Sequence, residues 1–79
     1  METKVAVVGI IICNTAVIPE LNEILSSYDQ YIIGRMGLPY ERRDLRVISI
    51  IMDAPADIIG CFTGKISRLS GVAANTVYA

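Results

Sequence analysis

The sequence predicts an α+β fold in which four antiparallel strands form one sheet and two helices cover one of its faces. Two segments with apolar residues at helical spacing alternate with four segments rich in β-branched residues, so the order is β-α-β-β-α-β. Only a short polar connection separates the two middle strands, as expected for antiparallel neighbours. Because crossover connections in one sheet are right-handed, both helices should lie on the same face.

The first strand is expected over Val5–Ile12, followed by the first helix. This strand is apolar at both parities, so it should be central and covered on both faces. Asn14–Thr15 offers capping side chains, and Pro19 fits the first helical turn. The helix ends near Ser26–Asp29. Its apolar face recurs at helical spacing and consists of Val17, Leu21, Ile24, Leu25 and Tyr28.

The two middle strands are expected over Tyr31–Leu38 and Leu45–Met52, joined by the polar segment Pro39–Asp44. Gly37 and Pro39 should shape the exit from the first of these strands as a bulge or a turn. The second of them is largely apolar at both parities, which again indicates a strand covered on both faces.

The second helix begins after Asp53, a capping acid, with Pro55 near its first turn and Asp57 within it. Gly71 suits the left-handed position that ends a helix. A short strand over Val72–Tyr78 follows, and residues 1–79 should form a single domain. The buried stripe of this helix is expected to be Ile58, Ile59, Phe62, Ile66 and Leu69.

The composition predicts self-association. Hydrophobic residues make up 53% of the 79 residues and charged residues only 19%, more apolar than so small a sphere needs. Both helices lie on one face of the predicted sheet, so the other face has nothing in the chain to cover it. We therefore expect a homo-oligomer, a dimer or a tetramer, formed through that face or by edge-to-edge pairing of sheets.

Several function classes are disfavoured by what the sequence lacks. It has no histidine, which removes a Ser-His-Asp triad and every His-based metal site from a single chain. The net charge of −1 and the absence of aromatic residues from Val5–Ile12 and Leu45–Met52 argue against binding nucleic acid directly. Arg42, Arg43 and Arg46 form the only basic cluster, which we interpret as a solvated hairpin.

Neither the apolar runs nor the cysteines indicate a membrane or a secreted protein. The longest apolar run, Val5–Cys13, is half the ~20 residues that a membrane-spanning helix needs. Cys13 and Cys61 are far apart in the sequence and fit no CxxC pattern, so we expect two buried, reduced thiols. A cytoplasmic location follows from that expectation.

Two local patterns of the sequence are distinctive: one is the run Arg35–Pro39, and the other comprises Ile59–Gly60, Gly64–Lys65 and Ser70–Val72. Together with the order of elements, they resemble the family of iron-only hydrogenase system regulators. The resemblance implies a ferredoxin-like fold, similar to ACT-type regulatory domains and to the C-terminal domain of the nickel-responsive repressor. It also implies dimers or tetramers that bind small effectors or metal between subunits, and no catalytic residues. Nickel chemistry is not carried over, because the repressor's site needs histidines. The residues that match the family pattern are Arg35, Gly37, Pro39, Gly60, Gly64, Lys65, Ser70, Gly71 and Val72.

Arg35 is a candidate anion-binding residue, because it lies in an otherwise apolar strand and a guanidinium suits carboxylate or phosphate groups. The alternative is a cross-strand partner for Asp44 or Glu41. Lys65 lies near Cys61 on one helix face and could activate that thiol, the alternative being an inert, buried cysteine.

Gly60 and Gly64, with Ser67 one turn further on, give the second helix a strip of small residues. This strip would admit the backbone of a partner chain or a ligand, or it would pack tightly on the sheet of its own chain.

These observations predict a non-enzymatic regulatory domain that needs no cofactor or resident metal. In this interpretation a small effector binds at a subunit boundary, near Arg35 or the Gly60–Gly64 strip, and biases the geometry of the oligomer. A partner would carry the output to transcription, since we identify no DNA-binding element. The alternative is a ligand-free interaction module that docks on a hydrogenase-associated partner.

Overall fold

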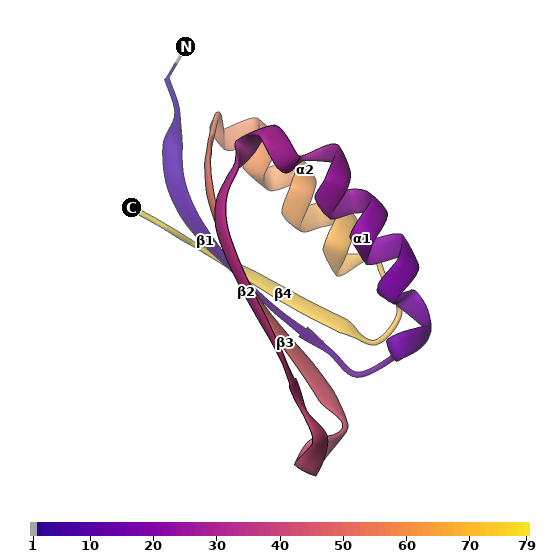
Figure 1. Ribbon diagram of the computed structural model, residues 1–79. Coiled ribbons are helices and arrows are strands. Elements are labelled where there is room, and N and C mark those ends of the chain that lie inside the picture. The colour runs from indigo at the N-terminus through magenta and orange to yellow at the C-terminus, as the bar shows by residue number, and fades with distance from the viewer. Residues whose placement is uncertain (1) are drawn as a thin grey trace.

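A computed structural model describes residues 2–79 and shows two layers, a four-stranded antiparallel sheet and a pair of helices packed on one of its faces (Figure 1). The strands are β1 (Lys4–Ile12), β2 (Ile32–Tyr40), β3 (Leu45–Ala54) and β4 (Val72–Tyr78). The helices are α1 (Ile18–Ser27) and α2 (Ala56–Ser67). The predicted α+β order and the helices on one face are confirmed.

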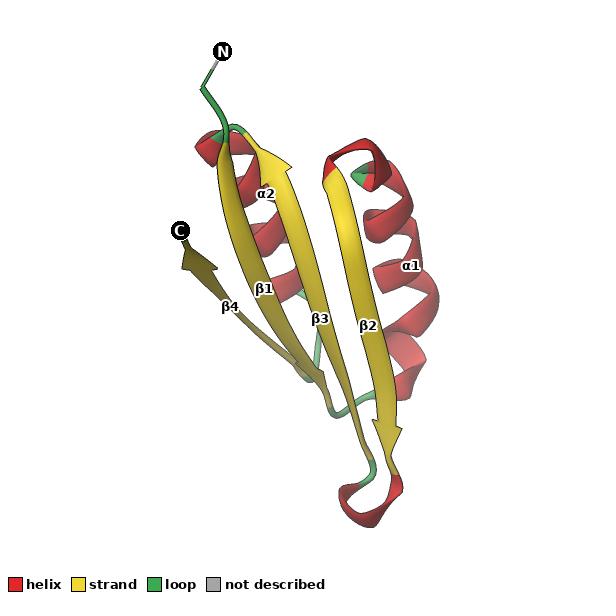
Figure 2. Ribbon diagram, turned by 60° about the vertical axis from the view of Figure 1, so that its left-hand side comes forward, coloured by secondary structure: helices red, strands yellow, loops and turns green. Residues whose placement is uncertain are grey.

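The strands lie in the order β2-β3-β1-β4, which places β1 and β3 in the centre and β2 and β4 at the edges. Figure 2 views the sheet with both helices behind it. β1 pairs with β3 over its full length, from Lys4 opposite Ala54 to Ile12 opposite Arg46. Because residues opposite one another in an antiparallel pair point to the same face, the register assigns each paired side chain of the sheet to the helix side or to the open side.

The core lies between the sheet and the helices. Alternate residues of β1, from Ala6 to Ile12, are buried, and the residues between them are exposed. Both predicted helix stripes are confirmed in outline, although Ile24, Ile58 and Leu69 are only partly buried. Phe62 is the bulkiest fully buried side chain, and its ring meets that of Tyr28 edge to face, with the ring centroids 5.1 Å apart. The fully covered large side chains are Val8, Ile10, Ile12, Leu21, Ile50, Met52, Ile59, Phe62 and Ile66.

The helix starts differ from those predicted. Asn14 does cap a turn, because its side chain accepts the backbone N–H of Ala16 at 3.1 Å, but this turn is a short 3₁₀ segment, Thr15–Val17, that precedes α1. Asp53 is not the cap of α2. It continues β3 opposite Val5, and Pro55 takes the cap position without a side-chain hydrogen bond. Pairing with β1 extends β3 past the residues whose local preference favours a helix start.

The β2–β3 hairpin also corrects two expectations. Gly37 forms no bulge, because it pairs in register with Ile48; the irregularity lies between Ile32 and Gly34. Pro39 is within β2, where an edge strand can accommodate a proline. The turn is a 3₁₀ segment, Glu41–Arg43, closed by a left-handed Asp44 with φ of 52°. The hairpin projects beyond the helices and gives the molecule extents of 42 × 19 × 17 Å (Figure 1).

Gly71 has the predicted left-handed conformation, with φ of 73°, but it lies beyond the helix end, which is capped at Arg68. Its carbonyl accepts the N–H of Cys13 at 2.8 Å, which ties the end of β1 to the start of β4. A Cβ at this position would lie 2.7 Å from Cβ of Asn14. Gly71 is therefore required by a close approach of two chain segments.

The face of the sheet opposite the helices is uncovered in residues 2–79, as predicted, and it is apolar. Nine large hydrophobic residues on this face are between 37% and 70% exposed to solvent. They are Val5, Val7 and Ile11 of β1, Met36, Leu38 and Tyr40 of β2, Val47 and Ile51 of β3, and Val77 of β4. Among the described residues, no helix is both long and apolar enough to cross a membrane.

Candidate effector groove

A shallow groove runs along the helix side of the β2–β3 hairpin, and Arg35 stands at one end of it. Arg35 pairs with the buried Ile50, so it points to the helix side of the sheet. Its end of the groove encloses about 250 Å³ between β2 and α1 and is lined by Asn22, Leu25, Arg35, Gly37 and Ile48.

The groove continues toward the hairpin turn and reaches a second arginine. Gly37 and Ile48 also line the next hollow, of about 230 Å³, together with Pro39 and Arg46. Arg46 is opposite both Pro39 and the buried Ile12, so it too is on the helix side. Two guanidinium groups therefore flank a floor of Gly37 and Ile48.

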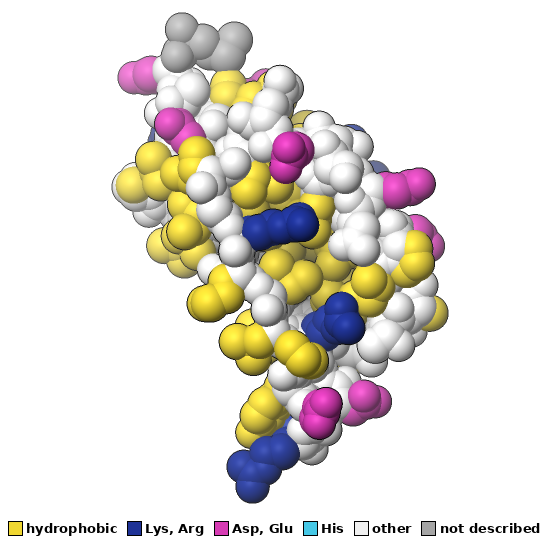
Figure 3. Space-filling view, in the orientation of Figure 1, with side chains coloured by type: hydrophobic (Ala, Val, Ile, Leu, Met, Phe, Trp, Pro, Cys, Tyr) yellow, Lys and Arg dark blue, Asp and Glu magenta, His cyan; other side chains and the backbone are white. Residues whose placement is uncertain are grey.

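Gly37 keeps this floor open. A Cβ built on it would lie 3.6 Å from Cγ1 of Ile48, an ordinary contact, so a side chain there would occupy the groove without straining the backbone. In Figure 3 two dark blue side chains cross a hydrophobic surface between the sheet and the helices. This combination of cations and apolar floor suits a ligand with an acidic group and an apolar part.

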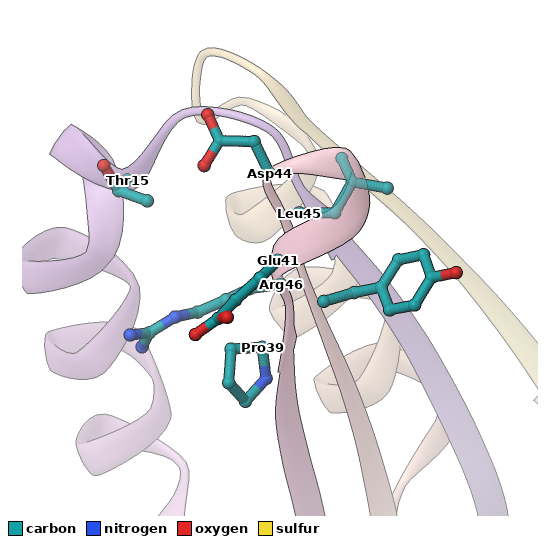
Figure 4. Close-up of a pocket in the computed structure, with 7 residues that line it drawn as sticks. Thr15, Pro39, Glu41, Asp44, Leu45 and Arg46 are labelled. Atoms are coloured by element: carbon teal, nitrogen blue, oxygen red, sulfur yellow. The ribbon is translucent and has the colours of Figure 1, made fainter.

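The turn end of the groove has mixed charge. A further hollow of about 160 Å³ is lined by Thr15, Pro39, Tyr40, Glu41, Asp44, Leu45 and Arg46. Figure 4 shows the side chains of Arg46 and Glu41 extending in the same direction beside Pro39. The acids at this end make the middle of the groove, between Arg35 and Arg46, the more favourable place for an anion.

The register removes the cross-strand alternative for Arg35. β2 is an edge strand, and the β3 residues opposite and diagonal to Arg35 on its face are Ile48, Ile50 and Met52. Glu41 and Asp44 lie in the turn beyond the end of the strand. Arg35 therefore lacks the acidic neighbour on β3 that a structural ion pair would use.

The Gly60–Gly64 strip lies on the solvent side of α2. Nothing lies within 4 Å of a Cβ built on either glycine, so packing on the chain's own sheet does not explain them. The open surface beside them is lined by Asp57, Gly60, Cys61, Gly64, Lys65 and Arg68. The strip belongs to the outside of the helix layer, whereas Arg35 belongs to the groove between β2 and α1, so the structure does not bring these candidates together.

Lys65 makes a contact that the sequence did not indicate, and the cysteines differ from expectation. The Lys65 ammonium lies 5.2 Å from the centre of the Tyr28 ring, a cation–π arrangement. Cys13 and Cys61 are free but exposed, so the prediction of buried thiols was wrong. No group of three or more potential metal ligands occurs within residues 2–79.

Arg46 was missed as a groove residue. The sequence interpretation placed it in a solvated hairpin with Arg42 and Arg43. Its parity was the available signal, because Arg46 alternates in register with Ile48, Ile50 and Met52 on the covered face.

The order of elements and the uncovered sheet face define a ferredoxin-like α+β domain. Residues 4–76 match the TM1266-like family, described as "Iron-only hydrogenase system regulator, putative", and the chain belongs to that family.

Solved structures agree with this assignment. The chain is similar to the uncharacterized protein TM1266 from Thermotoga maritima, with a TM-score of 0.93, 26% identity and 98% of each chain covered. It also shares its fold with CPII, a nitrogen regulatory PII-like protein from Thiomonas intermedia K12, bound to ADP, AMP and bicarbonate. That comparison has a TM-score of 0.53 and 16% identity over 99% of this chain and 93% of that one.

A second structure of CPII, bound to ADP, AMP and acetate, gives a TM-score of 0.51 and 16% identity over 100% of this chain and 92% of that one. No protein among the curated sequences matches the chain. The family description supports a regulatory role, and the PII-like structures show the shared fold.

Proposed function

We propose that this chain is a non-enzymatic, ACT-type regulatory domain, comprising residues 1–79, that binds a small anionic effector in the groove between Arg35 and Arg46. The observation that carries the proposal is the pair of guanidinium groups on either side of the open floor at Gly37 and Ile48. A guanidinium donates bidentate hydrogen bonds to carboxylate or phosphate oxygens. The rest of the lining offers apolar contact from Leu25 and Pro39.

The PII-like neighbours support this ligand class. CPII is described with ADP, AMP and bicarbonate or acetate, which are all anions. We place the groove ahead of the Gly60–Gly64 strip because the strip is an open surface on which Asp57 stands beside Lys65 and Arg68. An effector that ordered the hairpin would shift the homo-oligomer toward the conformation that the effector binds more tightly. The size of that shift is set by the difference in the effector's affinity for the conformations.

The output would pass to a hydrogenase-associated partner in the cytoplasm. In this scheme the chain does not bind DNA itself, and its effect on transcription is indirect. A mobility-shift assay at low salt with competitor DNA tests that point, and a specific shift by this chain alone would contradict it.

Ligand binding is tested by calorimetry and thermal unfolding with ADP, AMP, bicarbonate, acetate and inorganic phosphate. A ligand at 100 times its Kd stabilises the folded state by about 2.7 kcal/mol. Arg35→Gln and Arg46→Gln should each abolish that gain. The matched control is Arg42→Gln, which removes the same charge from the exposed hairpin turn. Binding that survives both groove variants, or no binding by any of these anions, would contradict the proposal.

The uncovered sheet face favours a second candidate, a ligand-free interaction module that docks on a hydrogenase-associated protein. Native mass spectrometry of gently purified chain separates the two: stoichiometric extra mass supports the effector sensor, and bare chains favour docking. Arg68→Gln asks whether the strip on α2 holds the ligand instead, because only that alternative predicts weaker binding in this variant.

A further inference from the structure

We propose that the open face of the sheet is the interface with a second copy of this chain, and that the two sheets pack face to face around a two-fold axis parallel to the strands. This inference takes one element from the proposed function, namely that the chain forms a homo-oligomer, and it does not depend on the effector site. It adds the surface, the direction of the axis and the residues that meet.

The area of the face matches what a dimer needs. Large side chains carry on the order of 150–200 Å² each, so the nine hydrophobic residues of the open face expose roughly 700 Å² in total. A stable interface of standard size buries about 800 Å² per partner. A monomer rarely exposes a contiguous apolar patch of this size without a use for it.

The charge distribution suits a second copy. A two-fold contact brings a patch against itself, so like charges on the patch would repel. On the open side, the paired positions of the sheet carry one charged residue, Asp53, and it lies at the end of β3. Lys4, Arg35 and Arg46 are all on the helix side.

The register arranges the open face in three rows that cross all four strands. In the order β2, β3, β1, β4, the first row is Gly34, Ile51, Val7 and Val77. The second row is Met36, Ser49, Gly9 and Asn75. The third row is Leu38, Val47, Ile11 and Ala73.

Each row is large at one edge and small at the other. Val77, 70% exposed, shares its row with Gly34, and Met36, 65% exposed, shares its row with Gly9 and Asn75. Around the small residues the face is hollowed by about 460 Å³, with a lining that includes Gly9, Ala73 and Asn75. Nothing lies within 4 Å of a Cβ built on Gly9.

A two-fold axis parallel to the strands, between β1 and β3, preserves the row and exchanges the edges. It places Val77 over Gly34 of the partner subunit and Met36 over the hollow beside the partner subunit's Asn75. Leu38 then lies over the partner's Ala73. Aligned sheets cross at about 30° and stack about 10 Å apart, so rows match to within about one residue.

The other face-to-face arrangement fits poorly. A two-fold axis perpendicular to the strands would place β2 over β2, so that the protruding Met36 met its own copy. The hollow at Gly9 and Asn75 would face the same hollow and remain unfilled, which forfeits packing contacts. Complementary shape therefore selects the axis along the strands.

The interface is tested first by analytical ultracentrifugation of the full chain. Met36→Lys and Val77→Lys should each weaken dimerisation at least roughly 30-fold, because a charge would replace an apolar side chain that packs against the partner sheet. Ser26→Lys is the matched control, since it adds the same charge at an exposed position of α1 and should leave the dimer unchanged. Circular dichroism checks that each variant is folded, as expected for substitutions outside the core.

Cross-linking tests the direction of the axis. In a Cys13→Ser, Cys61→Ser background, a short bismaleimide should join chains only when Met36→Cys and Asn75→Cys subunits are mixed. Efficient cross-linking by Met36→Cys alone would show the rejected axis and overturn the proposal.

The remaining outcomes separate this proposal from the proposed function. A wild-type monomer at high micromolar concentration overturns the interface and the homo-oligomer together, whereas anion binding is measured independently. An oligomer that tolerates both lysine variants overturns the interface alone and indicates pairing through the β4 edge. If the open face is covered only when a different protein binds, and never by a second copy of the chain, the proposed interface is likewise overturned.

Discussion

The two faces of the sheet are built from the same kinds of residue, but the helices bury one face and leave the other exposed. Ile10 and Ile11 are neighbours in β1, yet Ile10 is fully buried beneath the helices and Ile11 is 43% exposed. The helix side is closed by Leu21, Leu25, Ile59, Phe62 and Ile66, and the open side has no counterpart within residues 2–79. The difference shows that apolar sequence at both parities identifies a strand with two surfaces to cover, while the covering elements of the chain suffice for only one.

The sharpest way to break this comparison is to shorten each isoleucine in turn. Ile10→Ala should cost about 2–5 kcal/mol of unfolding free energy, because it leaves a cavity in a filled core. Ile11→Ala should cost less than about 1 kcal/mol in dilute monomer and more as the protein concentration rises. Urea denaturation at several concentrations gives both values, and equal losses in dilute solution would refute the distinction between the faces.

Glycines offer a second test. Gly71→Ala should cost roughly 2–3 kcal/mol, because the backbone is left-handed and the new Cβ meets Asn14. Gly9→Ala, on the open face, should be neutral or stabilise the monomer by up to about 1 kcal/mol, since its Cβ meets nothing. Thermal unfolding of the two variants in dilute solution measures the difference in their stabilities. Equal stabilities would show that the backbone at position 71 adjusts to the new Cβ without cost.

The covered face also contains a polar contact whose removal should have a smaller effect. The hydroxyls of Thr63 in α2 and Thr76 in β4 are 2.8 Å apart. Thr63→Val should cost about 1–2 kcal/mol because it leaves the Thr76 hydroxyl without this partner. The double variant with Thr76→Val should recover most of that loss, and a double-mutant cycle by chemical denaturation detects whether it does.

The smallest effect is expected on the outside of the helix layer. Gly64→Ala should stabilise the fold by about 1 kcal/mol, because alanine is the better helix former and the position is open. Chemical denaturation together with the mass in solution checks this. A stabilised chain with altered assembly would show that the strip on α2 is a contact surface as well.

The order of elements, the helix stripes and the uncovered face could be predicted from the sequence because each depends on periodicity. Positions set by pairing between distant segments could not. Asp53 carries a local helix-cap signal, yet its pairing with Val5 keeps it in β3. The register shifts between Ile32 and Gly34, although Gly37 and Pro39 carry the stronger local signal.

The candidate site was predictable in part for the same reason. Arg35 stood out as a charge within an apolar strand, and its place on the helix side followed only from the register. The joining of Arg35 and Arg46 through Gly37 and Ile48 depends on the hairpin projecting past α1, which periodicity does not report. Cys13 is exposed because it follows the last residue of β1, and Cys61 is exposed because it lies on the solvent side of α2 beside Gly60 and Gly64.

The projecting hairpin makes β3 unequal along its length. Ile50, Met52 and Ala54 are fully buried, whereas Arg46 and Val47 are exposed. Backbone amides near the turn should therefore exchange with solvent faster than those near Met52, since local opening there exposes little apolar surface. The groove lies beside the exposed, turn end of β3, so a bound ligand would slow amide exchange from Gly37 to Arg46. The buried end of β3, which pairs with β1, would transmit that ordering to β1.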